Sequence, residues 1–206
     1  MKLQEKLAVL IADDHAVIRL GLRLIISDMH QMYVHHEAKT YQEVYHTLEQ
    51  NLIHLLIIDI GMPGGDHISA IESIKLNHPE LKIIIFSSYP EHIYAARYLK
   101  AGADAYLHKD AGEEIIKKEI FNVLHSPRGL HIKPADISNH SDTLSILSDR
   151  ELDVANLLSN GLGNLEIANM LDLKMTTVST YKKRIFEKLG VANLPELIKL
   201  LNIDTR

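Results

Sequence analysis

Three carboxylates, a hydroxyl and a lysine stand at or just after the ends of short apolar runs of the chain. They are Asp13, Asp14, Asp59, Ser87 and Lys109. If folding brings the carboxylates together, their repulsion raises at least one pKa, and a Mg²⁺ ion, which prefers hard oxygen ligands, relieves it. One carboxylate can then attack a phosphoryl group while the metal, the lysine and the hydroxyl neutralise the transferred charge. These residue types therefore point to phosphoryl transfer onto an aspartate.

The apolar runs predict the framework that gathers these groups. They cover residues 7–12, 33–37, 55–59, 83–86 and 105–108, and the second is the weakest. Short, almost unbroken apolar runs are typical of parallel strands buried on both faces. Amphipathic stretches between them predict helices, and Thr40 and Ser88, each followed by a glutamate three residues later, predict capping boxes. We expect a parallel α/β sheet, and in the flavodoxin-like order strands one, three, four and five end side by side.

The pattern changes after residue 124. Residues 125–143 contain two prolines, a glycine and scattered polar residues without a period, which predicts a linker. Residues 144–206 have no strand-like run and predict four short helices. The expected caps or first-turn residues of these helices are Ser148, Asn164, Thr176 or Thr177, and Pro195. We therefore predict an α/β domain at 1–124 and a small all-α domain at 144–206.

The strand-end groups and their neighbours resemble the receiver domain of two-component response regulators. The resemblance covers about residues 6–124 and rests on the paired aspartates, on Asp59 followed by Met62-Pro63-Gly64, and on Ser87 and Lys109. It implies a flavodoxin-like (βα)5 receiver with Asp59 as the phosphoacceptor. It also implies that a sensor histidine kinase supplies the phosphoryl group.

The same resemblance implies a magnesium site. Asp14 and Asp59 would bind Mg²⁺ directly together with the carbonyl of Gly61, and Asp13 would act largely through water.

Further roles follow from the resemblance. Ser87 and Lys109 would hold the phosphoryl oxygens. Tyr106 falls at the aromatic switch position, whose ring turns inward when the hydroxyl of Ser87 is drawn to the phosphate. His67 and Asp110 depart from residues common in receivers, but neither replaces a reacting group.

A cationic cluster lies in the second predicted domain. Residues 144–206 carry eight basic and eight acidic residues, but five of the basic ones fall between Lys174 and Lys188. The helix expected there has an apolar stripe on one side, with hydroxyls and lysines largely off it, as entry into the major groove of DNA requires. The candidate DNA-binding residues are Thr177, Ser179, Thr180, Lys182, Lys183 and Lys188.

Residues 147–191 resemble the LuxR-type helix-turn-helix. The matching pieces are 147–151, Gly161, 166–168, Thr177-Val178 and 188–191. With the receiver in front, the whole chain resembles NarL/FixJ-type response regulators. The resemblance implies a scaffold helix at 164–171, a recognition helix at 176–189 and a dimer contact from the fourth helix. It further implies double-stranded DNA as a partner and a homodimer when phosphorylated, which predicts two half-sites about 10 bp apart.

The composition of the chain excludes several kinds of site and several classes of protein. The chain of 206 residues is 46% hydrophobic and has no cysteine, which excludes disulfides and thiolate metal sites. No apolar run approaches the ~20 residues that span a bilayer, and residues 1–6 lack the core of a signal peptide, so we expect a cytoplasmic protein without membrane contact. We expect the thirteen histidines to be packed or solvated rather than zinc ligands. His15 could tune the acidic pair that it follows, or begin the first helix.

We expect a phosphorylation-switched transcription regulator and not an enzyme, but two other hypotheses stay open. The protein could bind DNA without phosphorylation and use the receiver only for protein contacts. It could also be a phosphotransfer enzyme that acts on a small molecule. Aspartyl-phosphate phosphatases with related sheets usually have a second aspartate two residues after the nucleophile, and Gly61 occupies that position here.

Overall fold

The computed structural model describes residues 7–29, 32–63, 67–125, 144 and 146–201. The chain divides into two compact units, Met1–Asp136 and Ile137–Arg206, and each is described by itself. The predicted linker lies outside the described residues except for His125, and so does Gly64. The domain limits 1–124 and 144–206 stay predictions. None of the helices in the described ranges is long and apolar enough to cross a membrane.

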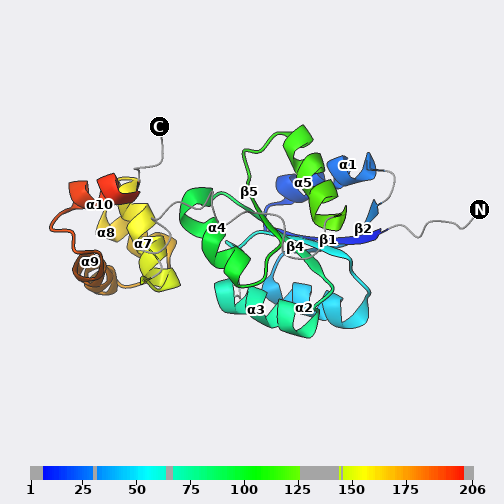
Figure 1. The fold of residues 1–206 in the computed structure, drawn as a ribbon. Helices are drawn as coiled ribbons and strands as arrows, with labels where there is room; N and C mark the ends of the chain where they lie inside the picture. Colours follow the sequence, from blue (N-terminus) through cyan, green and yellow to red (C-terminus); the bar gives the residue numbers. More distant parts are fainter. Residues whose placement is uncertain (1–6, 30–31, 64–66, 126–143, 145, 202–206) are drawn as a thin grey trace, which may run out of the picture. The chain divides into compact units, whose positions relative to one another are not determined.

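A five-stranded sheet forms the centre of the first unit (Figure 1). Its strands are β1 Leu7–Ala12, β2 Met32–Ala38, β3 Leu55–Ile58, β4 Lys82–Ser87 and β5 Ala105–His108. The order is β2-β1-β3-β4-β5, and every neighbouring pair is parallel. This confirms the flavodoxin-like order, and it places the carboxyl ends of β1, β3, β4 and β5 next to one another.

Helices cover both faces of this sheet. α1 Ala16–Ser27 and α5 Glu113–His125 lie on one face, and α2 Tyr41–Gln50 and α3 His67–Asn77 lie on the other, where α3 contacts α4 Glu91–Lys100 (Figure 1). Val9 and Ile11 of β1 pack with Leu22, Ile26 and Ile120 in the core under α1 and α5. Because both faces are covered, both alternating sets of strand side chains are apolar, which explains the unbroken runs in the sequence.

The two predicted capping boxes of this unit have different outcomes. Thr40 is the N-cap of α2, and its hydroxyl accepts a hydrogen bond from the Glu43 amide at 3.2 Å. The box is not complete, because the Glu43 carboxylate accepts from the Lys39 amide at 2.7 Å instead of the Thr40 amide. The prediction at Ser88 is wrong, because Pro90 is the N-cap of α4. A residue that precedes proline is disfavoured in the helical conformation, so the helix cannot begin before Pro90.

The second unit is all-α, as predicted. Its helices are α7 Asp149–Ser159, α8 Asn164–Met170, α9 Met175–Leu189 and α10 Leu194–Leu201. Ser148 caps α7 in a complete capping box with Glu151. Gly190 ends α9 in the left-handed conformation at φ 67°, which glycine adopts without a steric cost.

Two predicted helix starts in this unit are wrong by one or two residues. Gly163, not Asn164, is the N-cap of α8, and its amide donates to the Glu166 carboxylate at 2.7 Å. Lys174 is the N-cap of α9, and its carbonyl accepts a hydrogen bond from the Thr177 amide at 2.8 Å. At both starts the N-cap residue makes no side-chain capping hydrogen bond, so a search for capping side chains at that position does not detect them.

Candidate functional site

The carboxyl edge of the sheet carries the polar groups that the sequence predicts. Ser87 is the last residue of β4, and Asp13, Asp59 and Lys109 each directly follow a strand. Backbone hydrogen bonds continue past the strand ends. The Asp59 amide donates to the Ala12 carbonyl at 2.8 Å, and the Lys109 amide donates to the Ser87 carbonyl at 2.9 Å. The sheet itself therefore fixes the positions of these groups.

Lys109 joins two buried carboxylates. Its Nζ lies 2.7 Å from Asp13 Oδ2 and 2.8 Å from Asp59 Oδ2. Asp13 is 1% exposed and Asp59 is 6% exposed. Burial by itself lowers the pKa of Lys109, but hydrogen bonds and charge from Asp13 and Asp59 outweigh it and raise the pKa. One lysine cation is thus shared by two buried anions, and the excess negative charge favours a further cation.

Backbone amides hold the other oxygen of each aspartate. Asp59 Oδ1 accepts a hydrogen bond from the Gly61 amide at 3.0 Å. Asp13 Oδ1 accepts one from the His15 amide at 2.7 Å. Both carboxylates are therefore oriented as well as buried.

Arg19 on α1 braces the Asp13 backbone and was not identified from the sequence. Its guanidinium donates to the Asp13 carbonyl at 2.8 Å and to the Glu37 carboxylate at 2.9 Å. The residue is buried, in line with Leu22 and Ile26 on the core-facing side of α1. An arginine within an apolar helical stripe is the signal that could have found it, because such a charge needs a partner.

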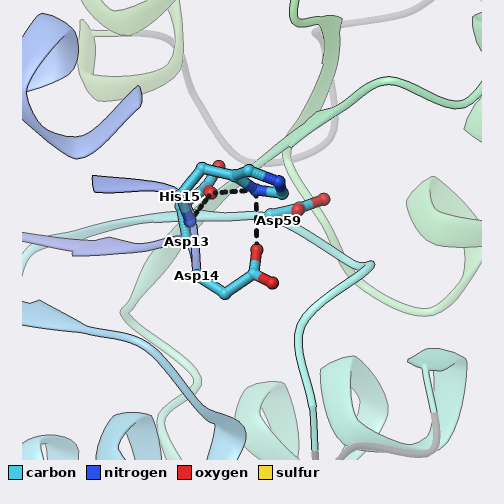
Figure 2. A group of neighbouring side chains, drawn as sticks. All are labelled: Asp13, Asp14, His15 and Asp59. Atoms are coloured by element: carbon cyan, nitrogen blue, oxygen red, sulfur yellow. Dashed lines mark hydrogen bonds and ion pairs between the residues drawn. The ribbon is translucent and has the colours of Figure 1, made fainter. Parts of the chain in front are cut away.

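Asp13, Asp14, His15 and Asp59 form one group, in which one ligand atom from each residue lies within 4.8 Å of the others (Figure 2). Asp13 and Asp59 are buried, whereas Asp14 and His15 are exposed. Carboxylate oxygens are the ligands that Mg²⁺ prefers, and an exposed flank lets the ion keep part of its water shell. With one lysine against three carboxylates, the donor set fits a Mg²⁺ ion.

Ser87 and Tyr106 meet at the backbone of Tyr89. Ser87 is buried, and its hydroxyl accepts a hydrogen bond from the Tyr89 amide at 3.2 Å. The Tyr106 hydroxyl donates to the Tyr89 carbonyl at 2.9 Å, and its ring lies 6.1 Å from that of Tyr98. Burial raises the pKa of Tyr106, so its hydroxyl remains a donor at neutral pH. The two predicted switch residues are thus linked through one peptide segment.

α9 presents the polar face predicted for a recognition helix. Val178 and Ile185 are buried against the rest of the unit. Thr176, Ser179, Thr180, Lys183 and Arg184 are exposed, and Thr177, Tyr181 and Lys182 are half-buried. Arg184, which was not among the predicted DNA-binding residues, lines a shallow hollow with Thr176, Thr177, Thr180 and Tyr181.

The predicted DNA-binding residues have different surroundings. Lys183 is 79% exposed, and Lys182 lies over the Phe186 ring at 5.7 Å. Ser179 accepts a hydrogen bond from the Asn164 side chain at 3.0 Å. Lys188 has an intramolecular partner, because its Nζ lies 2.6 Å from Glu151 Oε2.

Comparison with known protein families identifies the family to which the chain belongs. Residues 9–121 match the family described as response regulator receiver domain, and residues 145–201 match the bacterial regulatory proteins of the luxR family. The chain is a response regulator with a LuxR-type DNA-binding domain. The family predicted from the strand-end residues and the helix-turn-helix is confirmed, and its members are transcription regulators.

Relatives of this response regulator resemble it over almost its whole length. The oxygen regulatory protein NreC of Staphylococcus aureus is 32% identical, and the match covers 93% of this chain and 94% of NreC. RcsB of Salmonella enterica serovar Typhimurium, solved bound to the rprA promoter with the phosphomimetic BeF₃⁻, is 28% identical with a TM-score of 0.68, covering 96% and 99% of the two chains. A structure of two RcsB dimers on two parallel DNAs gives 28% identity and a TM-score of 0.60, covering 98% and 100%.

We expect Lys188→Met to destabilise the helical unit of this response regulator by about 2 kcal/mol, because hydrogen bonds to charged groups contribute roughly 1.5–3 kcal/mol. Burial raises the pKa of Glu151, but hydrogen bonds from Lys188 and Ser148 outweigh it and lower the pKa below its ordinary 4.5. The stabilisation is therefore complete above pH 4.5 and is lost as the pH falls through the lowered pKa. Urea denaturation followed by circular dichroism should show a difference between the variant and wild type that shrinks in acid.

Lys183→Met is the matched control. Lys183 lies on the same helix but pairs only loosely with Glu187, at 3.8 Å, and both side chains are exposed. Its loss should change the free energy of unfolding by less than about 0.5 kcal/mol. A Lys188→Met deficit that is equal at neutral and acid pH would contradict the assigned role of Glu151.

Proposed function

We propose that Asp59 is the phosphoacceptor of this response regulator and that a sensor histidine kinase supplies the phosphoryl group. The observation that carries the proposal is the buried Asp59 carboxylate, 2.8 Å from the Lys109 ammonium and grouped with Asp13 and Asp14. A nucleophile with a fixed cation and cation-binding carboxylates beside it has the electrostatic surroundings that phosphoryl transfer requires.

The proposed reaction forms a bond between an Asp59 carboxylate oxygen and phosphorus. The bond from phosphorus to the donor nitrogen breaks, and the kinase imidazole keeps the electron pair. Asp14, Asp59 and the Gly61 carbonyl would hold a Mg²⁺ ion, with Asp13 acting through water, and the bound ion would neutralise charge at the phosphoryl oxygens. Lys109, which already contacts Asp59, neutralises further charge. The buried carboxylates need no reorganisation, because amides of Gly61 and His15 orient them.

Ser87 and Tyr106 are proposed to transmit the effect of phosphorylation from the pocket to the protein surface. When the Ser87 hydroxyl turns to a phosphoryl oxygen, it gives up its hydrogen bond from the Tyr89 amide. The Tyr89 carbonyl holds the Tyr106 hydroxyl, so movement of this segment is coupled to the Tyr106 ring. A local charge change thereby biases a surface element between two arrangements.

We propose that this change controls sequence-specific binding of a homodimer to double-stranded DNA, and that transcription control rather than substrate turnover is the output. Two solved RcsB structures support this reading, one bound to promoter DNA with a phosphomimetic and one with two dimers bound to two parallel DNAs. The proposed contacts are Thr177, Ser179, Thr180, Lys182 and Lys183, and we add Arg184 because it is exposed on the same helix. Lys188 already donates to the Glu151 carboxylate and the Ile146 carbonyl, so a DNA contact by this residue would compete with an internal pair.

Intact mass after incubation with Mg²⁺ and acetyl phosphate tests the phosphoacceptor. Wild type should gain one phosphoryl group, and Asp59→Asn should gain none, because the amide is not a nucleophile. Removal of Mg²⁺ should abolish the gain. Phosphorylation of Asp59→Asn at the wild-type level would refute the assignment.

Footprinting with phosphorylated and unphosphorylated protein tests the coupling to DNA. Two half-sites about one helical turn apart should be protected more strongly after phosphorylation. Equal protection by wild type and Asp59→Asn, with and without phosphodonor, would instead favour DNA binding without phosphorylation. Steady turnover of a small phosphate ester would revive the enzyme hypothesis.

A further inference from the structure

The ring of His15 lies against the carboxylates of the phosphorylation pocket. Its Nδ1 is 2.8 Å from Asp14 Oδ1 and 3.2 Å from Asp13 Oδ1, and Figure 2 shows the ring reaching toward both. The residue is the N-cap of α1, but its side chain makes no capping hydrogen bond. The cap is therefore a backbone role that leaves the ring available for another function.

His15 offers a ring nitrogen to the same small space as the carboxylates. One ligand atom from each of Asp13, Asp14, His15 and Asp59 lies within 4.8 Å of the others. In the absence of an ion, the His15 nitrogen pairs with Asp14 Oδ1 at 2.8 Å and Asp13 Oδ1 at 3.2 Å, and a cation bound there would replace these contacts. The His15 amide is also bonded to Asp13 Oδ1 at 2.7 Å, which fixes the root of the side chain beside the pocket.

We propose that His15 is a nitrogen ligand of the pocket cation and lets the pocket take up divalent transition ions such as Ni²⁺ in competition with Mg²⁺. The inference rests on the cation pocket proposed above. Mg²⁺ prefers hard oxygen ligands, so it gains little from an imidazole. Imidazole nitrogen suits Ni²⁺, whose affinity for a mixed nitrogen and oxygen site exceeds those of Mn²⁺, Fe²⁺ and Co²⁺. His15 thus sets which ion the pocket selects.

Access and charge favour the same role. The His15 side chain is 68% exposed, so a hydrated ion can reach it from solvent. Asp13 and Asp59 share the single Lys109 ammonium, and Asp14 remains to attract a second cation. An ion bound through His15 and Asp14 would occupy the ligands that Mg²⁺ needs for phosphorylation. Phosphoryl uptake therefore becomes sensitive to the concentration of transition ions.

Calorimetric titration of the tag-free full chain with Ni²⁺ and, separately, with Mg²⁺ tests the proposal. His15→Gln should weaken Ni²⁺ binding by about tenfold or more, because the nitrogen ligand is lost, and should leave Mg²⁺ affinity within about twofold. The matched control is His46→Gln, since His46 is exposed on α2. It should bind both ions at the pocket as wild type does.

The three possible failures have different meanings. Equal Ni²⁺ affinity in wild type and His15→Gln would overturn the nitrogen ligand while leaving the Mg²⁺ pocket intact. An equal loss of Ni²⁺ and Mg²⁺ affinity would assign His15 a structural role at the start of α1 and would also overturn it. Absence of Mg²⁺ binding to wild type would refute the pocket proposed for phosphorylation, and this inference would fall with it.

Discussion

Lys109→Met is expected to lower the stability of the receiver unit in the absence of divalent ions by about 3–5 kcal/mol, the cost of leaving a buried ion pair without one partner. The Lys109 ammonium is the cation that separates Asp13 from Asp59, at 2.7 Å and 2.8 Å. Without it, two buried carboxylates repel each other. A bound cation can take over part of this neutralisation, so Mg²⁺ should restore more stability to the variant than to wild type. Urea denaturation with and without Mg²⁺ measures the difference.

Lys82→Met is the matched control for this experiment. Lys82 is also largely buried and pairs with Asp104 at 3.0 Å, but the same carboxylate keeps Lys75 at 2.9 Å. Lys82 begins β4, at the opposite end of the strand from Ser87. Its loss should therefore cost stability without any dependence on Mg²⁺. A Lys109→Met deficit that Mg²⁺ does not change would show that the ion does not bind beside Asp59.

The strand-end groups could be predicted because the sequence rule behind them is local. A short apolar run marks a buried parallel strand, and the next polar residue must emerge at its carboxyl end. Asp59 and Lys109 are 50 residues apart in the chain, but both positions follow from this rule once the strand order is known. The flavodoxin-like order supplied the remaining step, and the structure confirms it.

Contacts that depend on long-range geometry were not predictable in the same way. Nothing local to Arg19 indicates that it donates to Glu37 on β2, and nothing local to Lys188 indicates Glu151 on another helix. The basic character of Lys188 predicted a DNA contact, but in the folded unit its ammonium pairs with the Glu151 carboxylate. The helix start expected at Ser88 also failed, because proline two residues later outweighs the capping pattern.

Lys183→Ala is expected to weaken DNA binding and to reduce its salt dependence. Lys183 is 79% exposed on α9, where it can neutralise a DNA phosphate. Each phosphate contact contributes about −0.9 to the slope of the logarithm of the binding constant against the logarithm of salt concentration. The slope should therefore become shallower by about 0.9 for each protomer. Fluorescence anisotropy with labelled promoter DNA over a salt series gives both quantities.

The comparison of Lys188→Met with Lys183→Ala distinguishes a lysine that pairs with an internal carboxylate from a lysine that is exposed on the same helix. Both lysines carry the same charge, but only Lys188 lies 2.6 Å from an internal carboxylate. Because a cation paired with Glu151 releases no counterion from DNA, its loss should leave the salt slope unchanged once the protein is folded. A slope that falls equally in both variants would mean that Lys188 exchanges Glu151 for a phosphate on binding. The free energy lost when the Lys188–Glu151 pair breaks would then reduce the net free energy of DNA binding. Lys188 would thereby couple the stability of the helical unit to DNA binding.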